Sequence, residues 1–100
     1  MQELITRDEY VRHLNTNFIT KFDGDLTVEM RLVEVTDLIE RFGQRSFQLI
    51  FIAHPDTPPD ARIFEMKHEQ LGDLSISMEP FKKTSDYLAF QAIFSLLSNK

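Results

Sequence analysis

The side chains best suited to chemistry in this chain lie in and after one proline-rich loop. His54, Asp56 and Asp60 fall within the segment His-Pro-Asp-Thr-Pro-Pro-Asp, and His68 follows it. Imidazole and carboxylate groups are ligands for zinc and other divalent cations. Their spacing matches no established metal motif, however, and Pro and Asp are common in ordinary turns. We therefore expect a solvated turn here rather than the metal site of a hydrolase.

A second acidic segment, Asp23-Gly24-Asp25, offers oxygen ligands of the kind that calcium takes. A calcium-binding loop needs several more ligands and a Glu at its end, and this segment lacks both. An Asp-Gly pair between two strand-like runs is instead typical of a two-residue β-hairpin, because both residue types tolerate positive φ. The segment therefore predicts a hairpin turn.

His68 is the most informative single residue. It shares a predicted strand face with Phe64 and Met66 and directly precedes the turn at Leu71-Gly72. One interpretation makes it a general base or ligand at the mouth of a barrel. The other makes it a partly buried histidine that hydrogen-bonds the turn backbone. We favour the second, because no carboxylate is spaced to orient the ring and no nucleophile lies beside it.

The other side chains of the sequence include no recognisable catalytic group. The absence of cysteine excludes a thiol nucleophile, a disulfide framework and a thiolate metal site. The serines lie outside any Gly-x-Ser-x-Gly setting, and the 3 glycines are too dispersed for a phosphate-binding loop. The sequence therefore predicts a protein that is not an enzyme and that needs neither a metal nor a cofactor.

Charge and apolar pattern argue against nucleic-acid and membrane partners. The chain has 16 acidic and 11 basic residues, and the formal net charge of −5 repels phosphate backbones. Small basic clusters at Lys82-Lys83 and at Arg41 with Arg45 are expected to be solvated. No apolar run approaches the roughly 20 residues of a membrane helix, and the first residues are too acidic for a signal peptide. We expect a cytoplasmic location.

The elements that must position these residues begin with a helix. Thr6 followed by Glu9 forms a capping box, and Ile5 and Tyr10 occupy the positions of a hydrophobic staple. This pattern predicts a helix over about 7–14. It should end near Asn15, a residue type that tolerates the left-handed conformation.

After the helix, apolar residues alternate with a period of two, which is typical of strands. The pattern slips by one residue near Leu32-Val33, which predicts a bulge, and Pro80 is expected to end a strand. Short connections favour antiparallel pairing, so we expect one mainly β domain over 1–100, curled into a small barrel or roll. The expected strands are about 17–22, 26–37, 46–53, 62–69, 73–79 and 87–95.

Several isoleucines fall at outward strand positions, where a second apolar face would form if their strands were neighbours. An exposed face of this kind usually marks contact with a protein partner or a second copy. The competing explanation is that the apolar residues of the N-terminal helix, Tyr10, Val11 and Leu14, cover it. The candidate interface residues are Ile19, Ile50, Ile52 and Ile93.

The interior offers an alternative function. The 9 Phe and 2 Tyr fall mainly at inward positions, which indicates a core rather than an outward platform for stacking bases. Phe64, Met66 and Phe90 could line a pocket for an apolar ligand, with His68 at its mouth. That function needs a cavity, and small barrels are usually just wide enough for their own side chains.

Several segments of the sequence also resemble those of a known family. The run Leu32-Val33-Glu34-Val35, the run from Phe47 to Phe51 before Pro55, and the turn His68-Glu69-Gln70-Leu71-Gly72 occur in this order after the capped helix. Together they resemble, over about Leu4 to Phe94, a family of small bacterial proteins classed as a domain of unknown function. Asn15 stands where that family usually has Gly, and Phe42 stands in a normally polar turn.

Members of that family tend to be encoded near phage-tail-collar-like proteins, so the resemblance implies a role in assembly. The sequence predicts a complete fold but contains no arrangement of side chains suited to catalysis, which also favours a structural role. The leading hypothesis is a non-enzymatic structural or adaptor module that acts through protein contacts, with assembly of a phage-tail-like particle as the setting that the resemblance implies.

Overall fold

The structure is a computed structural model that describes residues 6–22 and 26–97. The first element, helix α1, spans Arg7–Arg12. Both halves of the predicted capping box are present: the Glu9 N–H donates to the Thr6 hydroxyl, and the Thr6 N–H donates to Glu9 Oε1 at 3.1 Å. The helix ends two residues earlier than predicted, although Asn15 does take the left-handed conformation at φ 66°. The staple residue Ile5 and the predicted hairpin at 23–25 lie outside the described residues.

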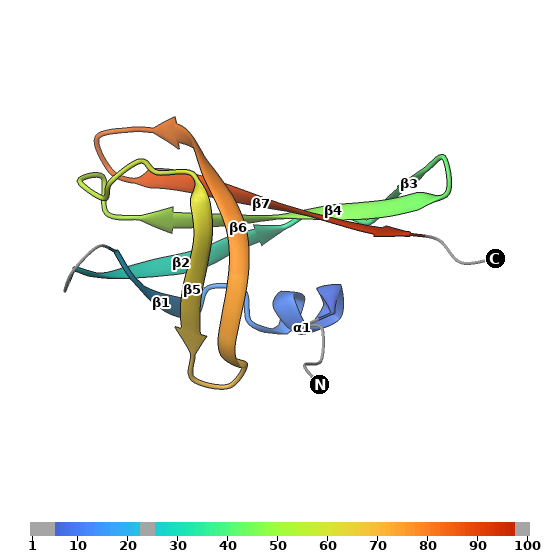
Figure 1. The fold of residues 1–100 in the computed structure, drawn as a ribbon, viewed down its shortest axis with the longest axis horizontal. Coiled ribbons are helices and arrows are strands. Elements are labelled where there is room, and N and C mark those ends of the chain that lie inside the picture. The colour runs from blue at the N-terminus through green and yellow to red at the C-terminus, as the bar shows by residue number, and fades with distance from the viewer. Residues whose placement is uncertain (1–5, 23–25, 98–100) are drawn as a thin grey trace.

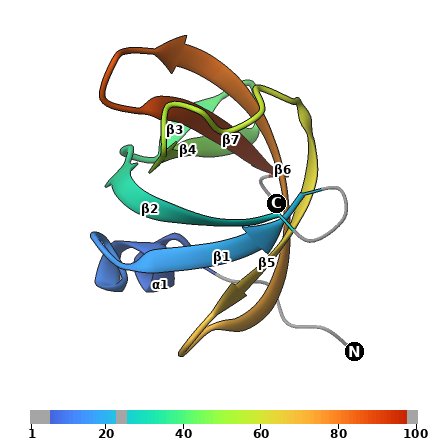
Figure 2. The ribbon, with the colours of Figure 1, turned by 90° about the vertical axis from the view of Figure 1, so that its left-hand side faces the viewer.

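Within the described residues, antiparallel strands close into a barrel (Figures 1 and 2). The order β2-β1-β5-β6-β7-β4 closes through a β2–β4 pairing, and β3 adds to the far edge of β4. The predicted small antiparallel barrel is confirmed, whereas β3 was not predicted. The strands are β1 Asn17–Lys21, β2 Thr27–Val35, β3 Ile39–Arg41, β4 Gln44–Ala53, β5 Arg62–His68, β6 Gly72–Lys83 and β7 Leu88–Leu97.

Two register shifts interrupt the strand pairing of the barrel. The register between β2 and β4 shifts between Leu32 and Glu34, which confirms the predicted bulge. The expectation that Pro80 ends its strand was wrong, because β6 continues to Lys83. A register shift between Pro80 and Lys82 accommodates the proline, since proline is tolerated at a bulge.

Phenylalanine rings make up a large part of the barrel interior. Ring centroids lie 5.1 Å apart for Phe18 and Phe51, and 5.5 Å apart for Phe64 and Phe90. All four side chains are almost completely buried. Edge-to-face contacts at this spacing are favourable beyond the burial of apolar area. The predicted assignment of the aromatic residues to the core therefore holds for these four.

Helix α1 packs against one end of this core. The Tyr10 ring stacks on Phe94 with centroids 5.8 Å apart and is tilted against Phe47 at 6.5 Å. Phe47 pairs with Phe94 across β4 and β7, on the inward face of the sheet. The helix therefore covers the inward face, not the outward face that carries the isoleucines. Within the described ranges, no helix has the length and apolar character needed to cross a bilayer.

A three-stranded extension projects from the barrel, and we call it the arm. It consists of β3, residues 44–48 of β4 and residues 92–97 of β7, and it extends away from the crossing of β5 and β6 in Figure 1. Pairing of β6 with β7 stops at Gln91, so the last part of β7 pairs with β4 alone. The arm gives the molecule its longest dimension, with principal extents of 45 × 31 × 22 Å.

Candidate functional site

His68 is buried at the end of β5, where it hydrogen-bonds the turn that follows. Its Nδ1 accepts from the backbone N–H groups of Gln70 and Leu71, at 3.0 and 3.2 Å. An accepting Nδ1 places the proton on Nε2, which donates to the Thr16 hydroxyl at 2.9 Å. That hydroxyl in turn donates to the carbonyl of His13 at 2.6 Å. Both ring nitrogens are engaged, so the ring has no free lone pair for a substrate.

The surroundings of His68 favour its neutral form. Burial, followed by the neighbouring His13, lowers the pKa of His68, and Glu69 opposes this shift. A protonated ring could not accept the two backbone N–H groups, so the hydrogen bonds demand the neutral state. This is the hydrogen bonding to the turn backbone that the sequence favoured.

The histidine and acidic residues of the proline-rich loop bind close neighbours in the chain. His54 Nδ1 accepts from the backbone N–H of Asp56 at 3.0 Å, and the carboxylate of Asp60 lies 2.8 Å from the guanidinium of Arg62. Within the described residues, no three His, Cys, Asp or Glu side chains gather into a group able to hold a metal ion. His54 is hydrogen-bonded within its own loop, whereas His68 is hydrogen-bonded to Thr16 and to the turn after β5. The segment 23–25 lies outside the described residues.

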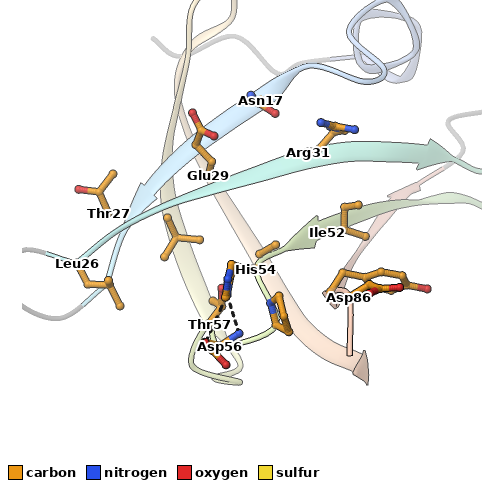
Figure 3. A pocket seen from close by; sticks show the side chains of 14 residues that line it. Asn17, Leu26, Thr27, Glu29, Arg31, Ile52, His54, Asp56, Thr57 and Asp86 are labelled. Carbon is orange, nitrogen blue, oxygen red and sulfur yellow. Dashed lines mark hydrogen bonds and ion pairs between the residues drawn. The ribbon is translucent and has the colours of Figure 1, made fainter. Parts of the chain in front are cut away.

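A surface hollow of about 560 Å³ lies beside this loop, between the start of β2, the end of β4 and the β6–β7 connection (Figure 3). Charged side chains line it, among them Glu29, Arg31 and Asp86. In Figure 3 the side chains of Glu29, Arg31 and His54 lie at separate places around the hollow. They do not converge on one point, as a catalytic group and its partner must.

The candidate residues for an apolar ligand are core residues. Phe64, Met66 and Phe90 are each at most 1% exposed. Phe64 contacts Phe22 on one side and Phe90 on the other, with ring centroids 5.4 and 5.5 Å apart. The space between these side chains is occupied by the chain's own rings, so a ligand would have to displace part of the core.

The predicted apolar outer face is only partly assembled. Ile93 lies opposite Gln48, and Ile50 lies opposite Gln91, so Ile50 and Ile93 are neighbours on the outward face of β4 and β7. Ile52 continues this face along β4 and is half-buried. Ile19 is separate from it, because its strand β1 is divided from β4 by β2.

The most exposed apolar side chain of the described residues was not among the predicted candidates. Phe42 forms the tip of the arm and is 101% exposed. It shares the two-residue loop between β3 and β4 with Gly43, and the two residues have φ of 53° and 77°. Positive φ at both positions is the pattern of a type I′ hairpin turn, where Asn and Gly are preferred. Phenylalanine is thus unfavourable here for two reasons: its apolar ring is exposed to water, and its backbone has a positive φ.

Other exposed apolar residues accompany Phe42 on the same hairpin. Leu38 and Ile39 precede it and are 43% and 51% exposed. Ile39 lies opposite Ser46, on the outward face of the arm. A sequence signal for this cluster did exist, since Phe42 stands in a turn that is normally polar. It was not read as a site because the strand before it is only three residues long.

The family comparison agrees with this fold and extends along nearly the whole chain. A domain of unknown function, DUF6916, matches residues 5–94. The chain belongs to the DUF6916 family. The match includes the capped helix, the barrel and the arm through Phe94, so all the structural features above fall within the DUF6916 domain. No curated protein and no solved structure matches the chain.

Proposed function

We propose that this DUF6916 domain is a non-enzymatic structural or adaptor module that binds another protein chain through the tip of its arm. The observation that carries the proposal is the complete exposure of Phe42 at a positive φ. A phenylalanine side chain left in water forgoes roughly 2 kcal/mol of burial free energy. The fold gains nothing from that position, whereas a partner that buries the ring would gain the full amount.

The composition of the arm favours a protein partner. Leu38, Ile39 and Phe42 lie within five residues of one another and are all exposed. Isolated exposed apolar residues are ordinary, but a cluster at the end of a projecting hairpin is typical of a contact surface. The net charge of −5 disfavours nucleic acid and anionic lipid, whereas phenylalanine and arginine are both enriched at protein interfaces.

The rest of the molecule is consistent with a role in contact rather than chemistry. His68 is fully hydrogen-bonded, Asp56 pairs with His54 in the loop, and Asp60 pairs with Arg62 at the start of β5. We extend the proposal to a cytoplasmic protein without a cofactor. The resemblance to proteins encoded near phage-tail-collar-like proteins suggests assembly of a phage-tail-like particle as the setting.

Site-specific photocross-linking in the cells that produce the protein tests this function. A benzoylphenylalanine placed at position 42 should give discrete adducts with another protein chain, because the probe replaces the side chain that makes the contact. The control is the same probe at Ile19, which is 41% exposed on β1, away from the arm. Equal adducts at both positions, or none at position 42, would contradict the proposal.

A further inference from the structure

We infer that the partner of the arm is a second copy of this chain, with Phe42 of one copy seated in a hollow on the outward face of the next. The inference rests on the proposed function and names the occupant of that contact. It predicts a head-to-tail arrangement, because the tip and the hollow are different surfaces of the same molecule.

The receiving hollow lies where β6 leaves β5 and crosses to β7, and its volume is about 380 Å³. Ile63 and Ile93 line it and are 63% and 55% exposed, so two large apolar side chains face water there. Between them, Gln91 donates from Nε2 to Glu79 Oε2 at 3.0 Å, which fixes the exposed carboxylate within the hollow.

The apolar surfaces match in kind. Phe42 exposes its whole ring, and the hollow presents branched apolar side chains from two different strands. Seating the ring between Ile63 and Ile93 removes three exposed apolar groups from water in a single contact. Aromatic rings buried in a pocket are the side chains that most often dominate the binding energy of an interface.

The charges also match. Arg41 precedes the tip and lies opposite Gln44 across the hairpin, so its cross-strand neighbour carries no charge, whereas Arg45 lies opposite Glu40. The segment 38–45 has two Arg and one Glu, while the chain as a whole has a net charge of −5. A cationic tip is therefore attracted to the body of another copy, and Glu79 offers a carboxylate to Arg41. The hollow is also lined by Arg62, whose guanidinium lies 2.8 Å from the carboxylate of Asp60.

Geometry prevents a copy from filling its own hollow. The tip directly precedes Gln44, and Gln48, four residues further along β4, lies opposite Ile93. At about 3.3 Å per residue these positions are roughly 13 Å apart along an extended strand, with the tip pointing away. Since a paired strand cannot fold back on itself, the contact must be made between molecules. Repetition of one head-to-tail contact produces a ring or a filament.

Sedimentation velocity over a range of concentrations tests this arrangement with complementary variants. Phe42→Asn removes the aromatic ring at the tip, and Asn tolerates the positive φ of that turn. Ile93→Asp places a charge in the hollow. We expect wild-type mass to rise with concentration, and each variant to lower the association constant by at least about tenfold. An equimolar mixture of the two variants should form dimers and nothing larger, because only one intact tip–hollow pair remains.

Controls make each outcome decisive. Ile19→Asn removes an exposed apolar side chain from β1 and should associate like the wild type, while Ile63→Asp should repeat the effect of Ile93→Asp. Circular dichroism of each variant confirms that it is folded. A mixture that stays monomeric while the wild type associates would overturn the head-to-tail contact. Wild-type protein that is monomeric throughout, while position 42 cross-links to a different protein, would overturn this inference and leave the proposed function standing.

Discussion

The imidazole rings of His13 and His68 meet edge to face with their centroids 4.9 Å apart, and they join helix α1 to the β5–β6 turn. His13 Nδ1 donates to the carbonyl of Glu9 at 2.7 Å, and its Nε2 lies 3.0 Å from Oε1 of Gln70. One histidine thus holds the helix end and the other holds the turn backbone. The two histidines therefore connect α1 to the end of the barrel that the helix covers.

This connection makes the stability of the barrel depend on pH. Burial and then His13 lower the pKa of His68 from 6.5, with Glu69 opposing, so the unfolded chain takes up a proton at higher pH than the folded one. The free energy of unfolding should therefore fall as the pH drops below 6.5 toward the lower folded pKa, by at most about 1.4 kcal/mol per pH unit. Urea denaturation from neutral to mildly acidic pH measures it.

The matched variants for this experiment are His68→Asn and His54→Asn. The first removes the buried titrating ring and should flatten the pH dependence over this range, at a cost of about 1–3 kcal/mol from altered hydrogen bonding. The second replaces an exposed loop histidine and should keep the wild-type slope. An unchanged slope in His68→Asn would show that another group carries the pH dependence.

Tyr10 offers a spectroscopic test of the helix packing. Burial, with a smaller contribution from Glu9, raises the pKa of Tyr10 from 10.0 to about 12. In the variant Tyr87→Phe only Tyr10 remains to titrate, and its tyrosinate absorbance should stay absent until the pH approaches 12 or the barrel unfolds. A tyrosinate signal that develops near pH 10 while circular dichroism still reports the folded barrel would mean that the helix does not shield this ring.

The turn at the tip of the arm should be more stable without its phenylalanine. Phe42→Asn should raise the free energy of unfolding of the monomer by about 0.5–1 kcal/mol, because Asn tolerates a φ of 53° better. Phe42→Val should lower it instead, since a β-branched residue is strained at positive φ. Thermal denaturation at low protein concentration compares the two. If Phe42→Asn is less stable than the wild type, Phe42 stabilises the fold itself and its exposure is not explained by a contact alone.

Local patterns predicted much of the fold because local physics decides it. The capping box at Thr6 and Glu9 produced a helix, and the slip in apolar period near Leu32 produced a bulge. The closing of the barrel was predicted only in general, because the pairing of β1 with β5 depends on contacts between distant segments. Strand β3 was not predicted because three residues are too few to show an alternating pattern. The end predicted for β6 at Pro80 was wrong because a bulge accommodates the proline.

The candidate site was predicted less well than the fold. The hydrogen-bonding role of His68 followed from its place before a turn, and the structure supplies Thr16 as its second partner. The outward isoleucines were identified by alternation, but alternation does not say which strands are neighbours, so Ile19 was grouped with residues of a distant strand. Phe42 was noted as unusual, yet its exposure depends on the arm extending beyond the barrel.

In the proposed assembly, molecules meet through the arm and the hollow rather than elsewhere on the barrel. Methyl NMR of the isoleucines, followed as unlabelled protein is added, tests it most directly. We predict that the resonances of Ile39, Ile63 and Ile93 shift or broaden, while those of Ile19 on β1 and the buried Ile76 stay in place. Changes centred on Ile19, or none at concentrations where the protein associates, would contradict the account.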